Sequence, residues 1–290
     1  MGGRAITVAD VVRRAVTRSY ERLVAHEDGL RIGEDPEAVH QARVATRRLR
    51  SDLRTFEDFV DAHWAADLRG ELRWLGSELG AVRDLEVQRD RLRAHAAALP
   101  PTEAAAAEHV IRRLDADREA ARADLLAMLH EPRYEQLRAQ LANAAQQPAF
   151  AASAAQPAAK ALAPVVRGRW KKLRNTVERL GDNPPDEALH ATRVRAKQCR
   201  YAAEACEPAF GKPARRLARE LGKVQDVLGE HHDAVVATAW LAKTAHECSP
   251  AEAYAIGMLA QLEREAAAGA RAAFPPTWER ARAVRARGEL

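Results

Sequence analysis

The sequence of 290 residues predicts an all-α fold. Alanine, leucine, arginine and glutamate dominate it, and these residues are strong helix formers. Runs of β-branched residues at strand periodicity are absent. Glycine and proline are confined to apparent junctions, where they commonly begin or end a helix. A chain of this length can form one large domain or two lobes of about 100–150 residues each.

Helix-start and helix-stop residues divide the chain into consecutive helices. Asp35 is the expected N-cap, and Pro36 the first residue, of the second helix. In the first half we expect helices over residues 5–25, 36–61, 64–98, 103–129 and 133–145. In the second half we expect helices over residues 160–180, from 184–186 onward, over 212–245, and two more after Pro250 that Pro275 and Pro276 separate.

Two motifs recur in the second half of the chain at nearly the same offset. The segment at 39–50 reads VHQARVATRRLR, and its counterpart at 189–200 reads LHATRVRAKQCR, an offset of 150. The segment at 79–87 reads LGAVRDLEV, and its counterpart at 228–236 reads LGEHHDAVV, an offset of 149. We therefore predict an internal duplication, with a first helical lobe at 1–147, a low-complexity connector at 148–158 and a second helical lobe at 159–290.

Each copy of the first motif carries a row of cations beside a row of apolar or small residues. The apolar positions alternate in steps of three and four, which is typical of a core-facing helical seam. They are Val39, Ala42, Thr46, Leu49, Leu53 and Phe56 in the first copy, and Leu189, Thr192, Ala196, Cys199, Ala203 and Cys206 in the second. In each copy, a row of cations follows these apolar positions by one residue. We call His40, Arg43, Arg47, Arg50 and Arg54 the first stripe, and His190, Arg193, Lys197 and Arg200 the second stripe. Arg48 lies beside the first stripe, and Tyr201 follows the second.

The stripes indicate an anion-binding groove between helices. Like charges three and four residues apart destabilise a helix, so we expect a chain that keeps them twice to use them. Guanidinium groups bind phosphate oxygens in a bidentate manner, and lysine adds a movable point charge. Neighbouring helices carry cations that would form a second wall, namely Arg14 and Arg18 in the first half and Lys171 and Arg174 in the second. The alternative is a charged face neutralised by carboxylates of other helices, such as Glu71, Glu78 or Glu220.

Histidine and aspartate residues would affect the charge and the geometry of such a site. His40 and His190 each begin a stripe near a helix N-terminus, which itself favours anions. We expect both imidazoles to be neutral in the empty site, because nearby arginines oppose protonation, and binding to tighten as the pH falls towards about 6. Asp84 and Asp233, which the second motif pairs, either orient stripe arginines or cap helices.

A metal site is less well supported. Glu37 with His40, and Glu187 with His190, have the Glu-x-x-His spacing of di-metal carboxylate bundles. Each of these histidines shares its helix face with several cations, so we predict no metal ligands. His231 and His232 are adjacent, so their side chains point about 100° apart on a helix and cannot easily bind one metal ion.

Composition and motif searches narrow the function classes further. Lysine and arginine total 46 against 41 aspartates and glutamates, so the position of the charges matters more than their sum. Phosphate-binding glycine loops and hydrolase motifs are absent, so we predict neither an enzyme nor a cofactor. Nucleic acid is the alternative to a phosphate polyanion without bases, but aromatic residues for base stacking are scarce near the stripes. The three cysteines show no disulfide pattern, and no signal or membrane-spanning segment is apparent, so we expect a cytoplasmic protein without a membrane partner.

The two motifs resemble those of the CHAD (conserved histidine α-helical) domain family. The family pattern is similar to VHQARVATRRLR with LGAVRDLEV, and to LHATRVRAKQCRYAAE with LGEHHDAVV, and the resemblance covers essentially the whole chain. It implies two helical-bundle lobes with pseudo-twofold symmetry around a basic groove or pore that binds inorganic polyphosphate. The ligand residues it implies are His40, Arg43, Arg47, Arg48, Arg50, His190, Arg193, Lys197 and Arg200.

The resemblance also suggests a cellular setting. Some members carry an additional CYTH-type triphosphatase domain. The 290 residues of this sequence leave no room for one, so we expect a stand-alone binder. Family members are associated with polyphosphate or polyhydroxyalkanoate granules, which makes a granule-associated scaffold a further alternative. This chain departs from the pattern at Gln198, which stands where the first copy has Arg48, and this difference predicts one contact fewer in the second lobe.

Overall fold

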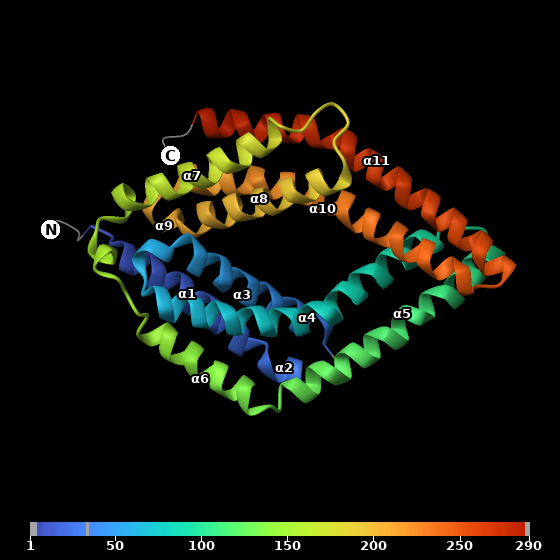
Figure 1. The fold of residues 1–290 in the computed structure, drawn as a ribbon, viewed down its shortest axis with the longest axis horizontal. Helices are drawn as coiled ribbons and strands as arrows, with labels where there is room; N and C mark the ends of the chain where they lie inside the picture. The colour runs from blue at the N-terminus through green and yellow to red at the C-terminus, as the bar shows by residue number, and fades with distance from the viewer. Residues whose placement is uncertain (1–4, 33–34, 288–290) are drawn as a thin grey trace.

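The computed structural model describes residues 5–32 and 35–287, and within these ranges the chain forms helices without strands (Figure 1). The predicted all-α fold is confirmed. The α-helices are α1 (Val8–Ala25), α2 (Glu27–Ile32), α3 (Pro36–Thr55), α4 (Ala62–Ala96), α5 (Pro101–Met128), α6 (Pro132–Gln146), α7 (Ala158–Val177), α8 (Asp186–Ala205), α9 (Glu207–Phe210), α10 (Lys212–Thr244) and α11 (Pro250–Ala286). Three short 3-10 helices are η1 (Glu57–Phe59), η2 (Ala152–Ala155) and η3 (Ala245–Glu247).

Side-chain caps set several of the helix starts. Thr7 and Asp10 form a reciprocal capping box at the start of α1, and Asp35 accepts a hydrogen bond from the Glu37 backbone at the start of α3, as predicted. The helix expected over 36–61 is wrong in its second part, because it ends at Thr55. Asp61 does not continue that helix but caps α4, so the chain turns between the two.

The prediction that Pro275 and Pro276 separate two helices is wrong. The helix α11 runs without interruption from Pro250 to Ala286. Both prolines are exposed, so water can satisfy the backbone carbonyls that lose a hydrogen-bond donor. On the opposite side, Phe274 and Trp278 are buried, and the Trp278 ring stacks on Trp170 of α7 with centroids 5.1 Å apart. Packing of this face outweighs the local cost of the prolines.

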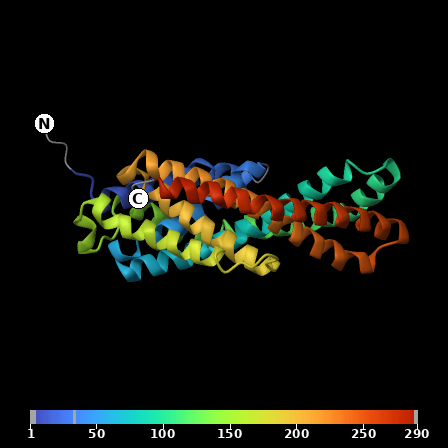
Figure 2. The same cartoon turned by 90° about the horizontal axis from the view of Figure 1, so that it is seen from above.

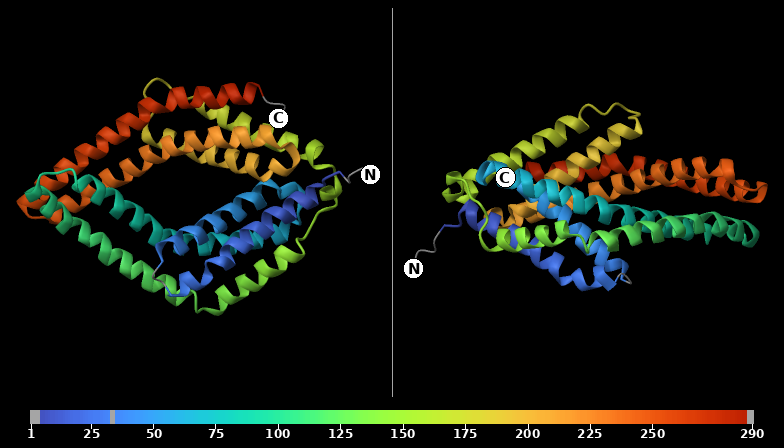
Figure 3. Two further views of the ribbon diagram at one scale, coloured as in Figure 1. Left: turned by 180° about the vertical axis from the view of Figure 1, so that it is seen from behind. Right: turned by 60° about the horizontal axis from the view of Figure 1, so that its bottom comes forward.

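Two long helix pairs give the molecule its elongated shape. The pairs α4 with α5 and α10 with α11 extend from the body and meet at a distant tip (Figures 1 and 2). A small apolar cluster lies there and joins the halves, with Leu92 and Ile111 packed in the same group as Leu241 and Leu259. The other core cluster fills the body, and it too contains residues of both halves. Figure 3 shows the same arrangement from behind, with the start of α1 and the end of α11 far from the tip.

Both predicted apolar seams are buried. Every seam residue of α3, from Val39 to Phe56, is at most 7% exposed, and every seam residue of α8, from Leu189 to Cys206, is at most 1% exposed. The 3-4 alternation therefore identified the core-facing side of both helices correctly. Because the stripes are offset by one residue, they lie at the edge of this core.

The segment predicted as a connector is packed against the first half of the chain. The backbone N–H of Val8 donates to the carbonyl of Gln156 at 3.0 Å, and that of Asp61 donates to Ala149 at 2.9 Å. Division into lobes at 1–147 and 159–290 stays a prediction, and residues 1–4, 33–34 and 288–290 of these ranges lie outside the described residues. None of the helices in the described ranges is long and apolar enough to span a membrane.

Replacement of Trp278 by alanine should destabilise the protein. Loss of a buried aromatic side chain leaves a cavity, and such changes cost about 3–5 kcal/mol. Chemical denaturation of Trp278→Ala should show this loss in the free energy of unfolding. The matched control is Tyr254→Ala on the same helix, where the side chain is 64% exposed and the change should stay within about 0.5 kcal/mol.

Candidate anion-binding site

The first and second stripes approach each other where α3 and α8 are in contact. Arg43 and Arg47 of α3 lie close enough to Lys197 of α8 to disfavour its protonated form, and Arg193 adds to this effect. Arg43 and Arg193 also repel each other directly. We call these four residues the central cluster. It combines cations from both halves of the chain at one place.

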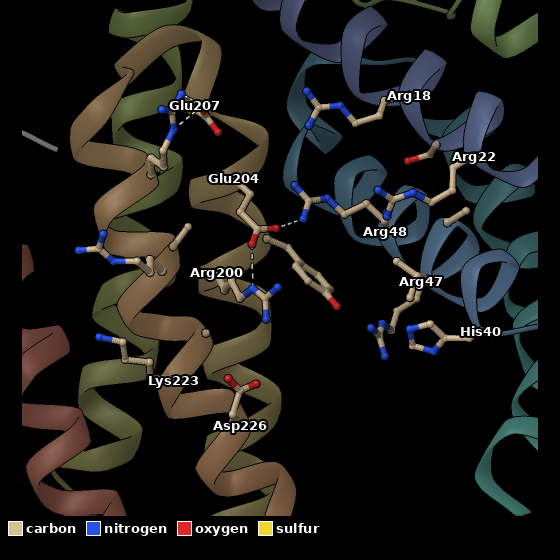
Figure 4. Close-up of a pocket in the computed structure, with 18 residues that line it drawn as sticks. Arg18, Arg22, His40, Arg47, Arg48, Arg200, Glu204, Glu207, Lys223 and Asp226 are labelled. Atoms are coloured by element: carbon tan, nitrogen blue, oxygen red, sulfur yellow. Dashed lines mark hydrogen bonds and ion pairs between the residues drawn. The ribbon is translucent and has the colours of Figure 1, made fainter. Parts of the chain in front are cut away.

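A cavity of ≈ 980 Å³ opens between the two halves beside the central cluster (Figure 4). Figure 4 shows the labelled residues of α1 and α3 facing those of α8, α9 and α10 across this space. The lysine and arginine residues that line it are Arg18, Arg22, Arg47, Arg48, Arg200, Arg215, Arg219 and Lys223. The carboxylates are Glu204, Glu207 and Asp226, and His40 completes the charged and titratable lining. Cations therefore outnumber carboxylates by eight to three.

The structure brings six of the predicted site residues to this cavity. They are Arg18, His40, Arg47, Arg48, Arg200 and Tyr201. Arg14 lines an adjoining cavity of ≈ 290 Å³ that shares Arg18 and Arg48 with the larger one. The Tyr201 ring is only 6% exposed and lies under three guanidinium groups, of which that of Arg48 is nearest at 5.0 Å from the ring centroid.

Several other predicted residues do not line this cavity. Arg50 is close to Arg54 and to Arg73 of α4, so the end of the first stripe lies against α4. Lys171 and Arg174 are exposed on α7, and Arg174 pairs with Glu178 at 3.4 Å. At this cavity the second wall is thus formed by α1 and α10, and α7 does not contribute to it.

The glycine of the second motif lies beside a stripe arginine in each half. A Cβ atom at Gly80 of α4 would collide with the Arg43 guanidinium. A Cβ at Gly229 of α10 would lie 3.7 Å from Nε of Arg193, which is ordinary contact distance. The motif therefore places a glycine beside the corresponding arginine twice, with the tighter fit in the first half.

The aspartate of the second motif contacts the same arginine in the first half. Nη2 of Arg43 donates to Oδ1 of Asp84 at 2.9 Å. Asp84 and Asp233 both lie well inside their helices, α4 and α10, so neither caps a helix. Burial raises the pKa of Asp233, and Arg193 opposes this rise. Of the two predicted roles, orientation of a stripe arginine is the one that the geometry of Asp84 fits.

Comparison with known proteins identifies the family. The family model described as CHAD domain matches residues 14–242. The chain belongs to the CHAD domain family. A crystal structure of the CHAD domain from the plant Ricinus communis is similar to it, with a TM-score of 0.72, 26% identity and coverage of 98% of this chain and 93% of that one.

Other similar proteins match most of this CHAD domain chain. PptA from Streptomyces chartreusis has the same fold, with a TM-score of 0.78 at 24% identity, covering 94% of this chain and all of that one. Two uncharacterised proteins of Mycobacterium tuberculosis, from strains CDC 1551 / Oshkosh and ATCC 25618 / H37Rv, are each 32% identical over 267 residues. These matches cover 89% of this chain but 50% of each relative, so the chain spans about half the length of these relatives.

Few carboxylates neutralise the stripes of this CHAD domain, and they are not the expected ones. Glu71 pairs with Arg133 at 2.8 Å, and Glu220 pairs with Lys223 at 2.9 Å. In the described part of the chain no ion pair joins Glu78 to a stripe residue. Instead, Glu204 contacts Arg48 and Arg200, and Arg48 also lies 3.4 Å from Asp52.

Burial and the crowding of cations lower the pKa values of several basic groups at the site. Burial, together with Arg47, Arg193 and Arg43, lowers the pKa of Lys197 to about 7, and Asp233 only partly offsets this shift. Burial lowers the pKa of His40, and Arg83 contributes further, which is the direction expected for this imidazole in the empty site. Arg43 and Arg50 likewise have lowered pKa values because of burial and neighbouring arginines.

The two adjacent histidines of α10 contact different partners. His231 is buried and lies 3.2 Å from Asp186, whereas Nδ1 of His232 lies 3.1 Å from Nδ1 of His190. Burial and Arg193 lower the pKa of His232 to about 4, so this ring is neutral beside His190. The described residues contain no cluster of three or more histidine, cysteine or carboxylate ligands that could hold a metal ion.

Sequence reasoning missed the cations that α10 contributes. Arg215, Arg219 and Lys223 line the cavity at intervals of four residues, and Arg22 of α1 joins them. The spacing of four is a signal that the sequence contains, because it places all three side chains on one face of a helix. Glu220, which stands between Arg219 and Lys223, gave this segment the mixed charges of an ordinary solvated surface.

The Lys197 ammonium group should titrate near neutral pH in the free protein. NMR of lysine side chains labelled with ¹³C and ¹⁵N should show one ammonium signal with a pKa of about 7. The same signal should be missing from Lys197→Gln, which assigns it. Asp233→Asn should lower this pKa further, because the Asp233 carboxylate favours the charged amine. A value near the ordinary lysine pKa of 10.5 would contradict the crowded cation cluster.

Proposed function

We propose that this CHAD domain binds inorganic polyphosphate, without turning it over, in the cavity between α1, α3, α8 and α10. The observation that carries the proposal is the convergence of eight cations from both halves on one space that holds three carboxylates. A linear polyanion with closely spaced phosphates matches such a lining, because each guanidinium offers two parallel donors to phosphate oxygens. The central cluster would extend this track along the stripes.

The lining favours phosphates without bases. Proteins that bind single-stranded nucleic acid combine cations with accessible aromatic platforms, on which bases stack. Tyr201 is the aromatic side chain that lines this cavity, and it is buried beneath Arg47, Arg48 and Arg200. A base could not stack on it without displacing those arginines.

Binding without turnover fits the state of the lining carboxylates. Phosphoryl transfer commonly requires carboxylates that hold Mg²⁺. Glu204 contacts Arg48 and Arg200, and Glu207 accepts a 2.9 Å hydrogen bond from Nε of Arg215. These two groups are engaged with arginines and do not form a joint metal site.

We also propose that the halves are duplicated lobes related by pseudo-twofold symmetry. In support, α3 and α8 have the same length of 20 residues, the same buried seam and a stripe at the same register. Arg43 and Arg193, which are equivalent in the two stripes, also each lie beside the glycine of the second motif. A cytoplasmic setting at polyphosphate granules would follow from this ligand.

Loss of two central arginines should abolish the preference for polyphosphate. We expect Arg43→Ala/Arg193→Ala to weaken binding of long-chain polyphosphate by about 100-fold or more, since hydrogen bonds to charged groups contribute about 1.5–3 kcal/mol each. Titrations at two salt concentrations, with single-stranded DNA of matched charge as competitor, should be compared at the higher salt, because counterion release weakens either polyanion.

The matched control for this pair is Arg112→Ala/Arg264→Ala. It removes two arginine charges from exposed positions on α5 and α11 that belong neither to the central cluster nor to the cavity lining. The control should bind nearly as tightly as the wild type. Equal binding of DNA and polyphosphate by the wild type, or equal effects of the two double substitutions, would identify a general basic surface in place of a site.

Binding should tighten as the pH falls from about 8 to about 6. Lys197 is partly deprotonated near pH 7 in the free protein, and bound phosphate would raise its pKa by adding negative charge. The complex therefore takes up a proton, and a proton taken up on binding increases affinity at lower pH. Isothermal titration calorimetry in buffers of different ionisation enthalpy should detect this uptake. In Lys197→Met this part of the pH dependence should disappear, and a flat affinity in the wild type would contradict the prediction.

A further inference from the structure

One carboxylate occupies the middle of the cationic cavity. Oε1 of Glu204 accepts a hydrogen bond from Nε of Arg200 at 2.8 Å, and Oε2 accepts one from Nη1 of Arg48 (Figure 4). Arg48 belongs to α3 and Arg200 to α8, so a single side chain joins guanidinium groups of both halves. The Glu204 side chain is 25% exposed and lines the open cavity, so it can leave this position without unfolding of the core.

At Glu204 the second copy of the duplicated sequence has a negative charge where the first copy has a positive one. At the offset of 150 that aligns the stripes, its counterpart in the first half is Arg54. Continuation of the second stripe by a cation would place another positive charge at this point of the cavity. The chain has a carboxylate there instead, and that carboxylate faces the same arginines that a ligand would use.

The contacts of Glu204 are those that a phosphate group would make. Two guanidinium groups converge on its two oxygens, which is the arrangement in which arginines hold phosphate oxygens. Arg48 has a second anchor, because Asp52 lies 3.4 Å from its Nε. Arg48 would therefore remain in place if Glu204 swung away, and its guanidinium would be free for an incoming anion.

We propose that Glu204 is a specificity-determining residue that occupies an anion subsite and selects long polyphosphate chains over short phosphates. This proposal rests on the proposed function. A short phosphate held by Arg48 and Arg200 must displace the carboxylate and gains few other contacts. A long chain also contacts the remaining cations of the cavity and the central cluster, so it binds around Glu204 without displacing it. The carboxylate therefore lowers the affinity for a short phosphate more than the affinity for a long chain.

The test compares tripolyphosphate with long-chain polyphosphate on the folded full chain. Glu204→Gln keeps the shape of the side chain and removes its charge. We expect tripolyphosphate to bind this variant about tenfold more tightly or better, on the scale of one or two hydrogen bonds to charged groups. Long-chain polyphosphate should gain less, so the ratio of the two affinities should fall. Thermal melts monitored by circular dichroism would verify that the variants are folded.

Asp226→Asn is the matched control. Asp226 lines the same cavity, and within the described ranges no ion pair joins it to Arg48 or Arg200. This variant removes the same charge and should improve both ligands by a similar, smaller factor. Equal effects of the two substitutions would reduce Glu204 to a general electrostatic contribution and overturn the proposal. Weaker binding of both ligands by Glu204→Gln would also overturn it, since Glu204 would then position the arginines. Failure of the wild type to bind long-chain polyphosphate would instead refute the proposed function itself.

Discussion

The structure depends on keeping like charges close together where α3 meets α8. Arg43, Arg47, Arg193 and Lys197 repel one another across this contact, and burial strengthens the repulsion because less water screens it. The apolar seams beside the stripes hold the helices in place against this force, as burial of apolar side chains is the main favourable contribution to folding. Burial and this repulsion together lower the pKa of Lys197, and release of its proton relieves part of the repulsion.

Contacts at the far tip hold the two halves together at a distance from the cations. Glu263 of α11 is fully buried and accepts a 2.6 Å hydrogen bond from Arg91 of α4, while Nδ1 of His95 lies 3.0 Å from the same carboxylate. Arg91 also contacts Glu230 of α10 at 2.7 Å. Together with the apolar cluster, these ion pairs join both helix pairs at the end of the molecule. Residues of both halves pack together at the tip and also in the core of the body, so mutual repulsion of the cations does not separate the halves.

The candidate site was predictable where it follows helical periodicity. The seams and stripes come from residues spaced three and four apart, and a helix converts that spacing into a common face whatever surrounds it. The α10 row at Arg215, Arg219 and Lys223 has a spacing of the same kind, but mixed signs along the helix concealed it. Helix ends were less certain. The chain continues as a helix through Pro275 and Pro276 because Trp278 stacks on Trp170, a partner more than 100 residues away.

The sequence by itself determined the helical class, the duplicated motifs, the buried faces of α3 and α8, and the presence of two cationic rows. Each of these is a local property that the order of residues fixes through helix geometry and side-chain type. The tertiary structure alone decided which cations meet, that Glu204 bridges Arg48 and Arg200, and that His232 pairs with His190. Electrostatic interactions depend on distances between atoms that lie far apart along the chain, and only the packing of helices sets those distances.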